Sequence, residues 1–187
     1  MYDWMQTYSG KKFILTDPRP EDIDIVDIAM SLTRMCRFNA HCLKFYSVAE
    51  HSIFVQTLVT TPHLKLPALL HDAHEAYLGD IIRPIKGYIA GRGIDVISTL
   101  SKKLDDCIAK SFGFNSYLFD SKEIINADLV ALATEKRDNM APLDWDTQLP
   151  DAHKNKLEFL NESTAFTTFM SLCNCLCGTN HSVSYLG

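Results

Sequence analysis

Apolar residues recur every three to four positions along most of this chain, which is the spacing of an amphipathic helix. Residues 1–20 lack that period, and we expect irregular or short extended structure there, with a turn at Gly10. The first helix is predicted from Glu21 to about Arg37, on the apolar positions Ile25, Ile28, Ala29, Leu32, Met35 and Cys36. Because strand signals are weak throughout, the pattern predicts an all-α, single-domain helical bundle over residues 1–187.

Two capping boxes place the starts of two further helices. In this motif a first side chain accepts a hydrogen bond from an exposed backbone N–H, and a glutamate three residues later reaches back to it. Ser47 and Glu50 predict a helix from residue 48, and Asp120 and Glu123 predict another over about 121–140.

Proline and glycine mark the next boundaries. Pro62 separates the second helix from a third, which is predicted over about 67–78 and is ended by Gly79. Residues 80–93 are rich in Gly and Pro, so we expect them to form a loop.

The last part of the chain is predicted to hold three more segments of interest. A helix is expected over 95–112, closed by Gly113, and a loop over 142–150 precedes a final amphipathic helix over about 153–173. The Cys-x-Cys-x-Cys run that follows (Cys173, Cys175 and Cys177) lacks the usual Cys-x-x-Cys zinc spacing, so these residues are expected to be ordinary thiols.

Composition is that of one globular domain, with 187 residues and 47% hydrophobic content. The chain carries 18 Lys and Arg against 23 Asp and Glu, a net charge of −5. This balance disfavours polymeric nucleic acid as a partner, while a small anionic ligand stays compatible. Neither a membrane-spanning run nor a secretory signal pattern is present in the sequence, so we expect a cytoplasmic protein with no membrane partner and with reduced cysteines.

Residue types that bind metals stand in three of the predicted helices. His71 and Asp72 are adjacent in the otherwise apolar third helix, His51 lies in the first turn of the second, and Asp128 lies in the fifth. Imidazole and carboxylate donors together suit a divalent first-row transition metal. Glu75, one turn after His71, is placed to orient a water or accept its proton.

Simpler interpretations exist for the single residues. Taken alone, His51 is explained as well by a structural hydrogen bond, and exposed Arg and Lys residues are usually solvated charges. The His-Glu-x-x-His pattern of one metalloprotease class is absent from the sequence, which excludes that class.

In chain order, His51, the His71-Asp72 pair and Asp128 reproduce the H…HD…D pattern, so the chain resembles the HD-domain phosphohydrolases. The resemblance includes Arg37-Phe38, Ser47-Val-Ala-Glu-His51 and the run His71-Asp-x-x-Glu75-x-x-x-Gly79-Asp80-x-x-x-Pro84-x-Lys86. It covers roughly residues 21–140 and points to the small nucleotide-cleaving branch, which includes 5'-deoxynucleotidases and phage dATP triphosphohydrolases. The resemblance implies a helical bundle of the HD-domain type.

The resemblance also implies a role for each matching residue. The metal ligands would be His51, His71, Asp72 and Asp128, binding Co2+, Mn2+ or Zn2+, with Mg2+ as an optional second ion. The catalytic residues would be Glu75, acting on the nucleophilic water, and Lys86. Contacts with the substrate would come from Arg37 and Lys86 at the phosphates, Phe38 and Pro84 at the base or sugar, and Asp80 at the sugar or a metal-bound water. Many members carry a tryptophan where this chain has Phe38, so the base pocket is expected to differ.

The implied reaction is hydrolysis of dATP to deoxyadenosine and triphosphate, which would deplete the dATP pool. Two alternatives stay open, a 5'-deoxynucleotidase acting on dNMPs and a non-catalytic nucleotide-binding HD scaffold. The presence of Asp72 and Glu75 argues against the scaffold. The resemblance further implies a homo-oligomer, either a dimer or a hexamer, and for a viral protein a place in the host cytoplasm.

Overall fold

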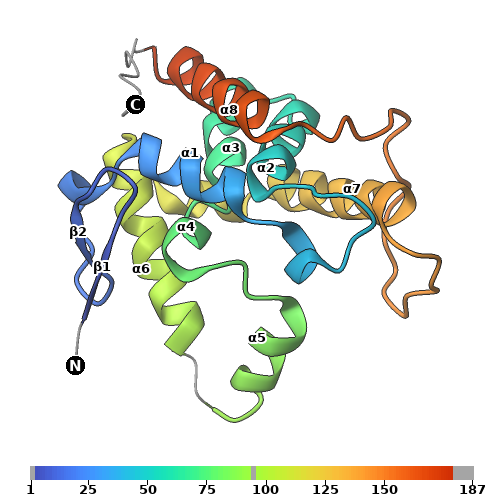
Figure 1. Ribbon diagram of the computed structural model, residues 1–187, viewed down its shortest axis with the longest axis horizontal. Coiled ribbons are helices and arrows are strands. Elements are labelled where there is room, and N and C mark those ends of the chain that lie inside the picture. Colours follow the sequence, from blue (N-terminus) through green and yellow to red (C-terminus); the bar gives the residue numbers. More distant parts are fainter. Residues whose placement is uncertain (1–2, 94–95, 179–187) are drawn as a thin grey trace.

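The computed structural model describes residues 3–93 and 96–178, most of which lie in helices (Figure 1). The mostly helical character expected from the sequence is confirmed. One small hairpin precedes the helices: β1 (Trp4–Gln6) pairs antiparallel with β2 (Lys12–Ile14), with Trp4 opposite Ile14. Residues 1–20 thus contain the short extended structure that was expected, and the turn includes Gly10 at φ +84°.

Helix α1 (Ile25–Arg34) is shorter at both ends than the predicted 21–37. Asp24 sets its start, because its side chain accepts a hydrogen bond from the backbone N–H of Val26 at 2.9 Å. Residues Pro20–Asp22 form a separate 3-10 turn before it. After Arg34 the backbone becomes extended, and Cys36 forms an isolated antiparallel bridge with Ser47.

Helix α2 (Val48–Leu58) begins where the sequence predicted. The Ser47 hydroxyl accepts a hydrogen bond from the N–H of Glu50 at 3.1 Å, which is half of the expected capping box. The Glu50 carboxylate does not return to Ser47 and instead accepts from the N–H of Leu160 at 3.0 Å. The long-range contact has replaced the local one.

The third predicted helix, 67–78, is interrupted. After the 3-10 turn Pro62–Leu64, the structure has α3 (Lys65–Leu70), a turn over residues 71–74, and α4 (Glu75–Leu78), which Gly79 ends at φ +83° as predicted. Within the interruption the N–H of Glu75 bonds to the carbonyl of Asp72, three residues back. This tighter winding places side chains three apart on the same face.

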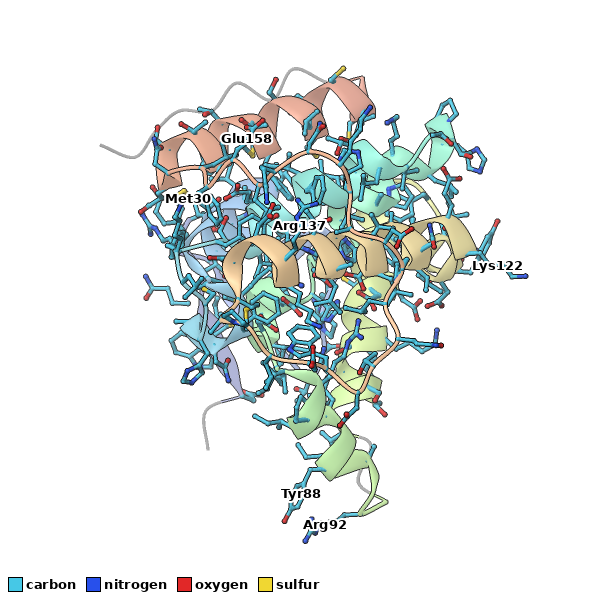
Figure 2. All side chains as sticks on the ribbon, turned by 90° about the vertical axis from the view of Figure 1, so that its right-hand side faces the viewer. Met30, Tyr88, Arg92, Lys122, Arg137 and Glu158 are labelled. Carbon is cyan, nitrogen blue, oxygen red and sulfur yellow. The ribbon has the colours of Figure 1, made fainter. Side chains whose placement is uncertain are left out.

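The loop predicted over residues 80–93 is wrong in part, because helix α5 (Arg83–Ala90) occupies its centre. Pro84 lies in the first turn of α5, where a missing N–H costs nothing and the fixed φ favours a helix. Helix α5 buries none of its residues and projects from the body, and Tyr88 and Arg92 lie at its outer end (Figures 1 and 2).

Helix α6 (Val96–Ser111) follows, and Gly113 at φ +75° comes after its end as predicted. The predicted first residue of this helix, Asp95, lies outside the described residues. A 3-10 turn (Ser116–Asp120) then leads to α7 (Lys122–Asn139).

The capping box expected for α7 at Asp120 and Glu123 is wrong. Ser121 is the capping residue, and its hydroxyl accepts from the N–H of Ile124 at 3.3 Å. Glu123 instead accepts from the N–H groups of Thr60 and Thr61, at 2.6 and 3.1 Å. Glu123 therefore ties the start of α7 to the end of α2.

Helix α8 (Glu162–Cys177) starts later than the predicted 153–173. The predicted loop over 142–150 is confirmed as non-helical, but the irregular segment continues to Asn161, whose side chain caps α8 by accepting from Thr164 N–H at 2.9 Å. Residues 153, 155 and 157 of this segment bond to the last turns of α7, which holds the segment in a non-helical path.

Helix α2 lies at the centre of the bundle and packs against α1, α3, α7 and α8 (Figure 1). The largest fully buried apolar side chains come from α1, α3, α6, α7, α8, strand β2 and the segment before α2: Phe13, Ile28, Leu32, Tyr46, Leu69, Leu70, Leu104, Ile108, Ile124 and Phe169. Cys173 is buried in the core face of α8, as an ordinary small apolar residue would be. Across the described ranges, the helices are too short or too polar for any of them to cross a membrane.

Replacing Glu123 should weaken the fold in a pH-dependent way. Its hydrogen bonds with Thr61 and Thr60 lower its pKa from 4.5 to about 2. A lowered pKa stabilises the fold above about pH 4.5, and this stabilisation is lost as the pH falls through about 2. We therefore expect the difference in unfolding free energy between wild type and Glu123→Gln to shrink from pH 6 to pH 2. Urea denaturation at several pH values measures this difference in unfolding free energy. The control is Glu158→Gln, which changes an exposed carboxylate. A difference that does not change with pH would contradict the prediction.

Candidate metal centre and adjoining cavity

His51 lies at the centre of the molecule, in the first turn of α2, and is fully buried. Its Nδ1 is 2.6 Å from Oε1 of Glu135, which is also fully buried. Because a carboxylate oxygen can only accept, the proton is assigned to Nδ1. The other ring nitrogen, Nε2, therefore faces the remaining polar groups of the site.

His71 and Asp72 lie in the turn between α3 and α4. Nδ1 of His71 donates to the carbonyl of Ala68 at 2.9 Å, so its Nε2 also points away from its own backbone. The two Nε2 atoms of His51 and His71 are 3.3 Å apart. Oδ2 of Asp72 is 3.3 Å from Nε2 of His71 and 3.6 Å from Nε2 of His51.

Asp128 reaches the same point from α7. Its Oδ1 is 3.2 Å from Nε2 of His51, and its Oδ2 is 3.4 Å from the Arg83 guanidinium. Burial raises the pKa of Asp128, but the hydrogen bond and the charge of His51 lower it by more. The pKa of Asp128 is therefore well below its usual range. Asp128 is therefore an anion at any physiological pH.

The arrangement fits a bound cation. Two imidazole nitrogens and a carboxylate oxygen of Asp72 converge, and Oδ1 of Asp128 lies close to Nε2 of His51. Each imidazole has already used its other nitrogen as a donor. Atoms that share a metal at about 2.0–2.1 Å lie roughly 3 Å apart, close to the separations found here. The ligand atoms of His51, His71 and Asp72 all lie within 4.8 Å of one another, so this group can hold a metal ion.

Glu75 lies beside these residues at the start of α4 and is 4% exposed. Among the described residues, its Oε2 has no hydrogen-bond partner. Burial raises the pKa of Glu75 to about 9, and the charges of Asp72 and Asp80 add to the rise. Glu75 thus presents a proton-carrying group to the cavity next to the cluster.

Arg37 connects the cluster to Glu135. Its Nε donates to Oε2 of Glu135 at 3.1 Å, and its Nη1 is 3.6 Å from Oδ2 of Asp72. Burial lowers the pKa of Arg37, but the charges of Glu135 and Asp72 outweigh that effect and raise it above its ordinary value. The guanidinium is therefore fixed by two carboxylates before any ligand binds.

The three residues that follow Arg37 form a left-handed turn. Phe38, Asn39 and Ala40 have φ values of 58°, 50° and 61°, a region that residues with a Cβ adopt at a cost of about 1–2 kcal/mol each. Hydrogen bonds hold the segment on both sides. The N–H of Arg37 donates to the carbonyl of Tyr46 at 3.0 Å, and the N–H groups of Leu43 and Lys44 donate to Asn139. Such strain is common at functional sites.

A cavity of about 510 Å³ opens next to the cluster. The residues predicted from the sequence that line it are Arg37, Phe38, Asp72, Glu75, Asp80, Pro84, Lys86 and Asp128. His51 and His71 lie behind them, with side chains 0% and 10% exposed. The structure therefore brings together every residue that the sequence singled out for the site.

Several residues of the site were not predicted from the sequence. Glu135 lies two turns after Asp128 on the same face of α7, and a buried acid at that spacing was the available signal. The cavity is also lined by Ile81, Ile82, Arg83, Leu132, Trp145 and Thr147. Arg92 does not line the cavity, and its guanidinium carbon lies 3.8 Å from the ring centroid of Tyr88 at the outer end of α5 (Figure 2).

Comparison with known proteins finds two similar sequences. The uncharacterized protein YfdR of Escherichia coli (strain K12) is 38% identical over 135 residues, which cover 72% of this chain and 71% of YfdR. The chain belongs to the YfdR family. The uncharacterized protein RCAP_rcc00048 of Rhodobacter capsulatus is 43% identical over 98 residues, which cover 48% of this chain and 50% of that protein. No family model matches the chain. Neither relative's name states an activity, so the chemistry must be inferred from the site.

Glu135→Gln should lower metal affinity by about 10- to 100-fold, because the carboxylate that orients His51 and sustains its basicity would be lost. Calorimetric titration with Zn2+ or Mn2+ measures the affinity, and circular dichroism checks that the variant folds. The control is Glu50→Gln, which removes a different buried carboxylate, one that lies in α2. An unchanged affinity in folded Glu135→Gln would contradict the assignment.

Metal binding should release protons. Burial and Arg37 lower the pKa of His51, but Glu135 and Asp128 raise it more, to about 9. Metal must then displace a proton below about pH 9, so affinity should rise with pH over the range 6.5 to 9. Calorimetry at pH 7 in buffers of different ionisation enthalpy should show release of at least one proton. Release of none would mean that His51 does not bind the metal.

Proposed function

We propose that this chain is a metal-dependent phosphohydrolase of the HD type that hydrolyses deoxynucleotides, with dATP as the preferred substrate. One observation carries the proposal: ligand atoms of His51, His71 and Asp72 lie within 4.8 Å of one another, and Asp128 lies 3.2 Å from His51, beside the buried Glu75 and a 510 Å³ cavity. A candidate metal site, a buried carboxyl group and room for a substrate therefore occur together.

The cavity suits an anionic small molecule. Its volume lies within the range of about 300–1,000 Å³ that is usual for small-molecule sites. Arg83 and Lys86 stand one turn apart on α5 and both line it, while Arg37 lies deeper. Cationic side chains in this arrangement offset the charge that gathers on phosphate oxygens during transfer.

The chemistry divides between the ion and the chain's own residues. A Co2+, Mn2+ or Zn2+ ion held by the four ligands, with Mg2+ as an optional second ion, would lower the pKa of a bound water and polarise the phosphoryl group. The charge of that ion would lower the pKa of the neighbouring Glu75, and the resulting carboxylate would take the proton from the attacking water. Lys86 would hold the phosphate through its ammonium group.

In the proposed reaction the water oxygen bonds to the α-phosphorus of dATP, and the bond from that phosphorus to the 5'-oxygen breaks. The products are triphosphate and deoxyadenosine, whose 5'-oxygen takes up a proton. Phe38 and Pro84 would flank the base or sugar, and Asp80 would contact the sugar.

A 5'-deoxynucleotidase acting on dNMPs is the second candidate, and one observation favours it. Arg37 is engaged by Glu135 and Asp72, and Arg83 by Asp128. Among the described residues that line the cavity, Lys86 is the cation without a salt bridge. One unengaged cation is enough for a single phosphate, whereas a triphosphate must also recruit Arg83.

Phosphorus NMR of the products tests the proposal. Metal-loaded protein incubated with dATP should release triphosphate, and release of orthophosphate from dAMP would select the second candidate. Glu75→Gln should reduce kcat by at least about 100-fold, which is the usual contribution of a general base. Lys86→Met should lower kcat/KM by about 10- to 100-fold, since one charge-assisted phosphate contact is lost.

The control is Lys103→Met, which removes an exposed lysine of α6 away from the cavity and should leave kcat/KM unchanged. Absence of turnover with dATP, dGTP and dAMP, although metal and nucleotide bind, would refute the enzyme and identify a nucleotide-binding scaffold.

A further inference from the structure

The segment that joins α7 to α8 contributes a wall of the cavity although it lies far from the metal-binding pattern in the sequence. Trp145 and Thr147 of this segment both line the cavity. Their neighbours Leu143, Asp144 and Asp146 are exposed, whereas Trp145 is half-buried.

Hydrogen bonds between the end of α7 and residues 153–157 hold the loop in place. Arg137 donates to the carbonyls of His153 and Asn155, at 2.6 and 2.9 Å, and Asp138 accepts from the N–H of Leu157 at 3.1 Å. Arg137 lies at the end of α7 against this returning segment (Figure 2). Residues 140–152 therefore form a closed loop whose two ends are bound to α7, which restricts where Trp145 can lie.

The indole ring is itself positioned. Nζ of Lys136, on the last turn of α7, lies 5.2 Å from the ring centroid of Trp145. A cation over the face of a tryptophan is an attractive contact, so Lys136 helps to hold the ring of Trp145 where it lines the cavity.

The cavity has both charged and apolar lining. Its apolar lining consists of Phe38, Ile81, Ile82, Pro84, Leu132 and Trp145. A ligand with an anionic group and a flat apolar group would match both kinds of lining. A nucleotide has that form, because its base offers a π face on which an aromatic side chain can stack.

We propose that Trp145 is a specificity-determining residue whose indole ring stacks on the base of the bound deoxynucleotide. The inference rests on the proposed function and adds the residue that recognises the base. Stacking favours the larger ring system, so purine deoxynucleotides depend on Trp145 more than pyrimidine deoxynucleotides do.

The chain offers a direct optical test because it contains two tryptophans, Trp4 and Trp145. Trp4 belongs to the β1 strand and does not line the cavity, so Trp4→Phe leaves Trp145 as the single reporter. Combining Trp4→Phe with Glu75→Gln suppresses turnover, and Zn2+ loading avoids paramagnetic quenching. Titration with dATP should then quench the indole fluorescence saturably, whereas 2-deoxyribose 5-phosphate, which has no base, should not.

Calorimetry on the same samples separates the possible failures. Binding of dATP with no change in the fluorescence of Trp145 overturns the stacking inference and leaves the proposed function standing. Absence of binding by dATP, dGTP and dAMP refutes the proposed function and, with it, this inference.

Substitution gives an independent measurement. Trp145→Leu should weaken dATP binding by about 5- to 150-fold, the range corresponding to loss of one base–aromatic stack. The loss should be smaller for dCTP, and Trp145→Phe should restore part of the dATP affinity. The control is Leu143→Ala, which alters an exposed residue of the same loop and should change nothing. Equal losses for dATP and dCTP, or no loss at all, would overturn the assignment.

Discussion

The site depends on one buried contact, the hydrogen bond between Nδ1 of His51 and the carboxylate of Glu135. Both side chains are fully buried, so the negative charge of Glu135 is tolerated only because His51 and Arg37 satisfy its two oxygens. In return, Glu135 fixes the ring orientation of His51 and turns Nε2 toward His71 and Asp128. Helices α2 and α7 are joined at the point where the candidate metal ligands meet.

The same contact extends to the cavity wall. Arg37 bridges Glu135 and Asp72, and the strained turn that starts at Phe38 follows directly. A change at Glu135 would therefore reach the candidate metal ligands through His51 and the cavity wall through Arg37. Charge balance, ring orientation and the shape of the pocket are properties of one hydrogen-bonded network, as is usual for buried polar groups.

Local signals in the sequence were enough for some features and not for others. The start of α2 and the glycines that follow α4 and α6 were predicted because a capping serine or a glycine acts on its immediate neighbours. The candidate metal ligands and Glu75 were singled out from their type and place in the predicted helices, whereas Arg37, Phe38, Asp80 and Pro84 came only from the resemblance. Glu135 and Trp145 were missed because their roles depend on contacts between distant segments. Helix α5 was predicted as a loop because Gly and Pro outweighed the favourable position of Pro84 in a first turn.

The ligand atoms come from α2, from the turn between α3 and α4, and from α7, which are far apart along the chain. In an unfolded chain only the neighbours His71 and Asp72 stay close, so a bound ion would act as a cross-link that exists only in the folded protein. Mass action then couples metal supply to folding: at a free metal concentration 100 times the Kd, the folded state gains about 2.7 kcal/mol. The metal content of the growth medium would thus help to set how much folded protein a cell accumulates.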